Sequence, residues 1–77
     1  MAGSTHSVRY REFRRRLKQA REACGLTQRA VALRLHRPPS FIAKVEIGER
    51  RLDALELDDL AAIYGKAVAW FIPSRAK

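Results

Sequence analysis

Cysteine is almost absent from this chain: its 77 residues include only Cys24, so no disulfide can form within it. No cluster of Cys and His residues offers a metal site. No apolar run is long enough to cross a membrane, and the N-terminus lacks the apolar core of a secretory signal. We therefore expect a cytoplasmic protein without metal, cofactor or membrane attachment, stabilised by packing alone.

Acidic residues are scarce in the first two thirds of the chain. Residues 1–51 hold 13 Lys and Arg against four Asp and Glu, a net charge of +9, whereas residues 52–77 have a net charge of −1. A concentrated basic region is typical of a protein that binds a polyanion. The alternative is a basic surface that serves only solubility.

Strand patterns are also missing, and apolar residues recur at helical spacing instead. From about Val8 to Cys24, inward positions follow at steps of three and four residues: Tyr10, Phe13, Leu17, Ala20 and Cys24. Gly25 is expected to end this helix. We interpret residues 1–7 as a disordered tail, residues 8–73 as one domain and residues 74–77 as a basic tail.

Two short helices are expected next. Thr27 caps a helix of about eight residues, because the segment 36–39, with its two consecutive prolines, cannot continue it. The following helix is predicted to cover roughly Pro39–Ile47, with Ile42 and Val45 facing inward and Phe41 at the margin.

Two more helices complete an all-α fold. Asp53 and Glu56 fit a capping box before a helix over about 54–64, which Gly65 ends. A short helix over about 67–72 follows, and Pro73 stops it.

An ordered set of residues extends through this pattern without gaps: Arg21, Gly25-Leu26-Thr27-Gln28, Val31-Ala32, Leu35, Ser40, Ile42, Glu46, Gly48-Glu49-Arg50-Arg51, Leu60-Ala61, Gly65 and Val68-Ala69-Trp70. With this set, residues 21–72 resemble the helix-turn-helix family of lambdoid phage repressors, Cro proteins and their small bacterial relatives, the XRE family. The resemblance implies a compact five-helix, lambda-repressor-like domain whose second and third helices form the helix-turn-helix. His36 departs from the family, in which glycine is usual in this turn.

The resemblance also implies which side chains meet DNA. Outward residues of the third helix should touch base edges: Pro39, Ser40, Ala43 and Lys44. Because few of these side chains can read bases directly, part of the specificity should come from DNA shape. Phosphate contacts are expected from four residues: Gln28, Arg37, Arg50 and Arg51. Arginines of the first helix should join them at longer range.

Two structural features follow from the same resemblance. Arg21 and Glu46 should form a largely buried salt bridge, and Trp70 should lie in the core.

The small size of the domain predicts a dimer. Apolar residues that so small a domain can hardly bury are expected to form a homodimer face: Leu55, Tyr64, Phe71 and Ile72. Such a dimer would read an inverted repeat.

These features favour a transcriptional regulator, repressor or activator, that binds a palindromic operator in double-stranded DNA. No small-molecule effector is expected, because no sensor domain fits in the remaining residues; a protein partner could control it. The alternative is an antitoxin that neutralises a partner protein and regulates its own operon. An enzyme is not supported, since no nucleophile–base pair or phosphate loop is present. A membrane-surface helix would leave the other helices unexplained.

Overall fold

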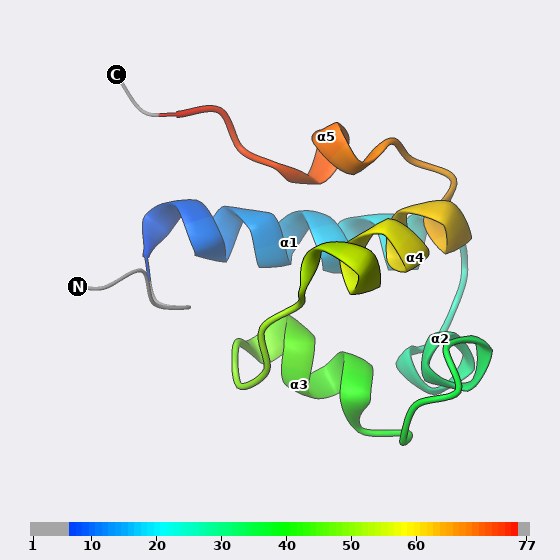
Figure 1. Ribbon diagram of the computed structural model, residues 1–77. Helices are drawn as coiled ribbons and strands as arrows, with labels where there is room; N and C mark the ends of the chain where they lie inside the picture. The colour runs from blue at the N-terminus through cyan, green and yellow to red at the C-terminus, as the bar shows by residue number, and fades with distance from the viewer. Residues whose placement is uncertain (1–6, 76–77) are drawn as a thin grey trace.

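The computed structural model describes residues 7–75, and these fold into five helices. In chain order they are α1 (Val8–Ala23), α2 (Gln28–Arg34), α3 (Phe41–Ile47), α4 (Ala54–Tyr64) and α5 (Val68–Phe71). The long α1 runs through the middle of the molecule (Figure 1). Helix α5 packs on α1 and α4 at one side, and α3 packs on α1 and α2 at the other. Among these residues no helix has the length and apolar character needed to span a membrane.

Side-chain caps begin three of the helices. The hydroxyl of Ser7 accepts a hydrogen bond from the backbone N–H of Tyr10 at 3.0 Å. Thr27 caps α2 in the same way, and Asp53 and Glu56 form the capping box of α4. Ser7 therefore belongs to the folded domain, which corrects the prediction of a tail over 1–7; residues 1–6 lie outside the described part of the chain.

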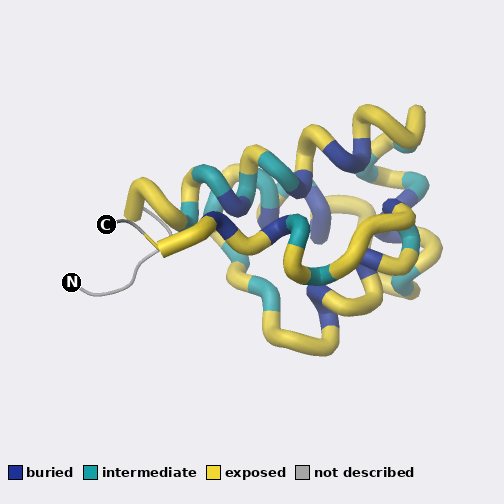
Figure 2. Tube along the Cα trace, turned by 90° about the horizontal axis from the view of Figure 1, so that it is seen from above, coloured by how far each residue is buried: buried dark blue, intermediate teal, exposed yellow. Residues whose placement is uncertain are grey.

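One apolar cluster joins residues from all five helices, and Figure 2 shows the buried positions on the inner sides of the helices. Its members are Phe13, Leu17, Ala20, Val31, Ala32, Phe41, Ile42, Val45, Leu57, Leu60, Ala61, Tyr64 and Phe71. Trp70 is half-buried and meets Phe71 edge to face, with ring centroids 5.0 Å apart. The C-terminal third is thus part of the same core.

Two of the four residues predicted to form a dimer face lie in this core instead. Tyr64 and Phe71 are only 4% and 0% exposed. The prediction was wrong because α5 folds back across α1 and α4, so a single chain buries both rings. Leu55 and Ile72 remain exposed.

The inward faces of α1 and α3 also differ from prediction at one residue each. Cys24 is exposed, because it follows the last turn of α1, and Arg21 takes the inward position instead. Phe41 is buried and not marginal. Helix α3 begins at Phe41, since Pro39 and Ser40 still belong to the turn, and this start directs the Phe41 ring into the interior.

Among the glycines of residues 7–75, Gly48 has the strictest requirement, because it ends α3 with φ +89° against the side chain of Arg14. A Cβ at this position would lie 3.1 Å from Cζ and Nη1 of Arg14. We predict that Gly48→Ala lowers the free energy of unfolding by more than the roughly 1–2 kcal/mol that left-handed strain alone costs.

Gly25→Ala is the matched control, since Gly25 has φ +70° but no atom within 4 Å of the added Cβ. Urea denaturation of both variants measures the difference. Equal losses in the two variants would show that the Arg14 contact contributes nothing.

Candidate nucleic-acid interface

The turn between α2 and α3 is closed by backbone hydrogen bonds. The N–H of Arg37 donates to the carbonyl of Ala32 at 3.0 Å, and the N–H of His36 donates to that of Leu33 at 3.1 Å. His36 has φ +57° and is the one non-glycine residue in the left-handed region between residues 7 and 75. Histidine thus takes a left-handed position that glycine would adopt without strain.

The carboxylate of Glu46, on α3, is bound by both preceding helices. Arg21 of α1 donates to it twice, from Nε at 2.8 Å and Nη2 at 3.1 Å, and Gln28 of α2 donates from Nε2 at 2.9 Å. The Arg21 and Glu46 side chains are only 10% and 5% exposed. The hydrogen bond to Glu46 raises the pKa of Arg21 above its usual value. This ion pair matches the one that the sequence predicts.

A second arginine of α1 holds the end of α3 through the backbone. Arg14 donates from Nη1 to the carbonyl oxygen of Glu46 at 3.0 Å. Together with the contacts to the Glu46 side chain, this bond fixes α3 against α1 at both its inner face and its last turn. The other side of α3 is left uncovered.

Four exposed residues mark this uncovered side among the described residues: Pro39, Ser40, Lys44 and Ile47. Ala43, the remaining predicted base-contacting residue, is half-buried. Ile47 was not predicted, although it follows Lys44 by three residues and therefore lies on the same helical face. The exposed surface of α3 thus combines one cation, one hydroxyl and apolar groups.

Of the predicted phosphate-contacting residues, Gln28 and Arg51 have contacts within the protein that the sequence did not indicate. One amide hydrogen of Gln28 is used by Glu46, which leaves a single side-chain donor. The guanidinium of Arg51 lies over the Tyr10 ring, 4.9 Å from its centroid. Arg51 therefore lies at the junction of α1 and the α3–α4 loop.

Arg37 and Arg50 meet at the carboxylate of Glu56, in the first turn of α4. Arg37 donates from Nη2 to Oε2 at 2.7 Å, and Arg50 donates to both oxygens, from Nη1 at 2.9 Å and Nη2 at 2.7 Å. The hydrogen bond from Arg50 is the main reason that the pKa of Glu56 falls to about 2. Sequence reasoning assigned Glu56 only to a helix cap, because its arginine partners come from two distant turns.

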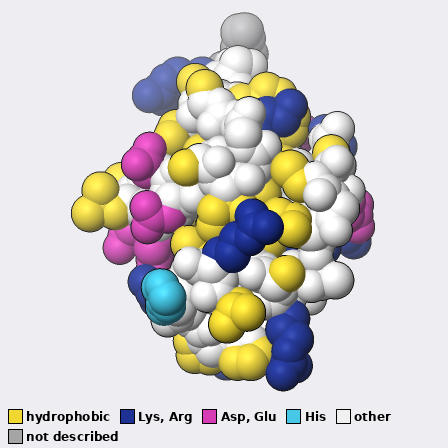
Figure 3. Space-filling view, turned by 90° about the vertical axis from the view of Figure 1, so that its right-hand side faces the viewer, with side chains coloured by type: hydrophobic (Ala, Val, Ile, Leu, Met, Phe, Trp, Pro, Cys, Tyr) yellow, Lys and Arg dark blue, Asp and Glu magenta, His cyan; other side chains and the backbone are white. Residues whose placement is uncertain are grey.

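The opposite charge gathers elsewhere on the surface. Asp58 and Asp59 are exposed on α4, and Asp59 and His36 line one hollow between α2 and α4. Figure 3 shows the histidine in cyan beside a group of acidic side chains. Arg34 lines the same hollow, so the acidic side chains of α4 also have a basic neighbour there.

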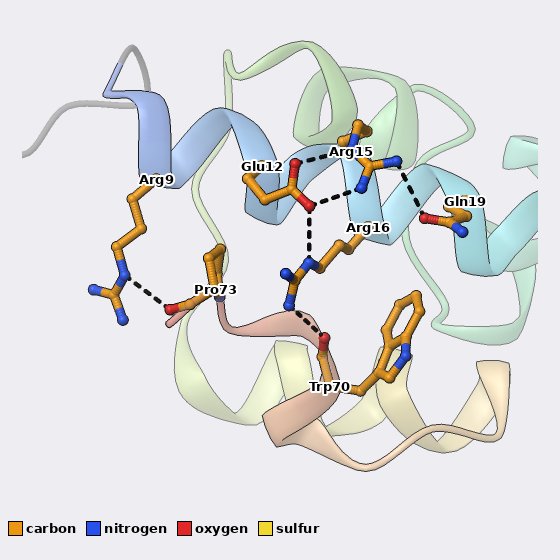
Figure 4. Close-up of polar contacts among 7 residues, drawn as sticks. All are labelled: Arg9, Glu12, Arg15, Arg16, Gln19, Trp70 and Pro73. Carbon is orange, nitrogen blue, oxygen red and sulfur yellow. Dashed lines mark hydrogen bonds and ion pairs between the residues drawn. The ribbon is translucent and has the colours of Figure 1, made fainter. Parts of the chain in front are cut away.

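Two arginines of α1 bind backbone carbonyls of the C-terminal segment (Figure 4). Arg9 donates from Nε to the carbonyl of Pro73, and Arg16 donates from Nη1 to that of Trp70, each at 3.0 Å. Arg16 and Arg15 also pair with Glu12, and these hydrogen bonds lower the pKa of Glu12 to about 2. Much of the positive charge of α1 thus has a structural role.

The buried ion pair gives a stability prediction. Glu46→Ala leaves the Arg21 guanidinium buried without its partner, and we expect a loss of about 3–5 kcal/mol in the free energy of unfolding. Glu12→Ala, which removes a partly exposed acid of α1, should cost far less. Thermal or urea unfolding of both variants measures the contrast. A wild-type melting curve for Glu46→Ala would contradict the role given to this pair.

Comparison with known proteins identifies the family. A model of the helix-turn-helix domain matches residues 12–68. A solved structure described as an XRE-family like protein from Pseudomonas syringae pv. tomato str. DC3000 is 41% identical, with a TM-score of 0.75, and the match covers 86% of this chain and 82% of that chain. A comparison with curated proteins gives no match. The predicted lambda-repressor-like, five-helix fold is confirmed, and the chain belongs to the XRE family of helix-turn-helix DNA-binding proteins.

Proposed function

We propose that this protein is a transcriptional regulator that recognises a specific sequence in double-stranded DNA by inserting α3 into the major groove. The observation that carries the proposal is the asymmetry of α3: Ile42 and Val45 are buried on one side, while Lys44 is exposed on the other. A recognition helix needs such a fixed inner side and an accessible outer side. Members of this family are typically non-enzymatic DNA-binding proteins, in keeping with this role.

Base reading would depend on few groups. Lys44 can donate to guanine O6 or N7, and Ser40 can donate or accept. Pro39, Ala43 and Ile47 offer only apolar contact, for instance to a thymine methyl group. With so sparse a reading surface, the protein also needs discrimination through DNA shape and deformability.

Phosphate contacts would position α3 in the groove. Arg37 and Arg50 lie in the turns before and after α3, and Arg51 follows directly. Such contacts supply affinity that depends on salt, without sequence information. Gln28, at the first turn of α2, would add a neutral donor.

We further propose that the regulator binds an inverted repeat as a homodimer. Leu55 and Ile72 are large apolar side chains that the single chain leaves exposed. Ile72 also lines a groove of about 360 Å³, whose other lining residues include Tyr10, Leu52 and Leu57. A two-fold pair of such surfaces would place two recognition helices on one side of the duplex. Repression or activation would then depend on the position of the operator relative to the promoter.

Lys44→Ala tests the reading role of α3. Because Lys44 would donate to a base edge, we expect a relaxed preference at one base position, together with weaker binding to the preferred duplex. The measurement is selection of bound sequences from random duplex DNA at two salt concentrations, for the wild type and for each variant. Arg34→Ala is the control, since it removes the same charge from an exposed residue beside Asp59.

A wild-type protein that enriches no motif would overturn sequence-specific regulation. If Lys44→Ala and Arg34→Ala change the motif equally, Lys44 has no reading role. If Lys44→Ala weakens binding to all duplexes equally and leaves the motif unchanged, Lys44 contacts only a phosphate.

Leu55→Asp tests the dimer. A charge at this exposed apolar position would be buried in the proposed contact, so we expect a shift toward monomer in analytical sedimentation at micromolar concentration. Leu33→Asp is the control, because Leu33 and Leu55 are 75% and 76% exposed but only Leu55 belongs to the proposed face. A wild type that sediments as a monomer, alone and on DNA, removes the dimer from the proposal.

A further inference from the structure

The carboxylate of Glu56 accepts hydrogen bonds from three residues, one in the α2–α3 turn and two in the α3–α4 loop. Both of its oxygens accept hydrogen bonds from Arg50, one also accepts from Arg37, and the other accepts from the backbone N–H of Asp53 at 2.9 Å. The Glu56 side chain is buried. One acid of α4 thus joins two arginines from the turns before and after α3.

The aromatic ring of Phe41 supports both guanidinium groups. Their Cζ atoms lie 4.8 Å (Arg37) and 5.0 Å (Arg50) from the ring centroid. Because Phe41 is the first residue of α3 and is buried in the core, the ring links the arginine pair to the position of the recognition helix. We call these four residues the arginine cluster: Arg37, Phe41, Arg50 and Glu56.

The arginine cluster retains charge and donors for a ligand. Two guanidinium groups and one carboxylate leave a net charge of +1. A guanidinium has five N–H donors. Within residues 7–75, Arg37 uses one of them, and Arg50 uses three, counting the bond from Nη1 to the carbonyl of Arg51. Both side chains are partly exposed. An anion with several acceptor oxygens matches this arrangement.

We propose that Glu56 is a positioning residue for DNA binding: it holds Arg37 and Arg50 on Phe41 so that their outward N–H groups receive one phosphodiester of the DNA backbone. The inference rests on the proposed function, since it takes the exposed side of α3 as the side that meets DNA. It assigns to an acidic residue a favourable part in binding a polyanion. Without the carboxylate, two like charges would repel and each long side chain would sample many rotamers.

This role differs from a simple electrostatic effect in the sign of its result. If Glu56 only reduced the positive field, neutralising it would strengthen binding to any duplex. If Glu56 positions the arginines, neutralising it should weaken binding to the preferred duplex, where the register of phosphate contacts matters, while binding to a scrambled duplex stays equal or increases.

Glu56→Gln is the decisive variant. The Gln carbonyl can still accept from the N–H of Asp53, so the capping box of α4 is retained. We expect the affinity ratio of the preferred over the scrambled duplex to fall about tenfold, the effect of losing one well-made charge-assisted contact. Asp59→Asn is the control, because it makes the same change of charge at an exposed position of the same helix. In this control the ratio should not change.

Two results would overturn the inference. One is that Glu56→Gln and Asp59→Asn strengthen binding to both duplexes alike. The other arises if Glu56→Gln fails to fold and Arg37→Lys is tested instead: Arg37→Lys keeps the charge but loses the planar donor set, so wild-type binding in it would exclude a positioned guanidinium.

A separate measurement distinguishes this inference from the proposed function. In the wild type, the Nε–H resonances of Arg37 and Arg50 are followed by NMR as a scrambled duplex is added. Saturable shifts of both resonances are expected even if no sequence is preferred, in which case only sequence specificity would fail. If neither resonance moves while the duplex binds, the arginine cluster is not a phosphate site.

Discussion

The helix-turn-helix depends on the hydrogen bonds that the buried carboxylate of Glu46 accepts from the two preceding helices. Removing a carboxylate from water is costly unless charges and hydrogen bonds replace the lost hydration, and here α1 supplies Arg21 and α2 supplies Gln28. Helix α3 has only seven residues and would not persist alone. Its orientation is therefore determined by contacts made from its inner side, and its outer side can carry almost any reading residues.

Arginine serves two purposes in this molecule, and the total charge does not separate them. Three arginines of α1 donate to backbone carbonyls: Arg9, Arg14 and Arg16. Arg14 thereby holds α3 against α1, and the other two hold the C-terminal segment against α1. Around α3, Arg37 and Arg50 contact an acid and an aromatic ring, and their side chains stay partly exposed. The strongly basic first two thirds of the chain therefore overstates how much charge DNA could meet.

Local signals made the helices predictable, whereas features that depend on tertiary contact were missed. The bounds of α4 follow from its capping box and from the glycine after Tyr64, both of which act within a few residues. The burial of Phe41 depends on the helix phase set by a turn with two prolines, and that of Phe71 on α5 folding back over α1. The partners of Glu56 come from turns 19 and 6 residues away, and no periodicity indicates such a meeting. The ordered XRE pattern supplied Glu46 and the exposed side of α3.

Besides the buried ring of Phe71, two hydrogen bonds to its backbone hold the C-terminal segment, and these bonds have an evolutionary consequence. Arg9 and Arg16 bind the carbonyl oxygens of Pro73 and Trp70, groups that every amino acid possesses. The side chains at exposed positions such as Ala69 and Ile72 can therefore diverge while the segment keeps its place on α1. In the proposed dimer, duplicated copies of such a gene could acquire different pairing preferences by substitutions there, without altering α3, and so become insulated from one another within one cell.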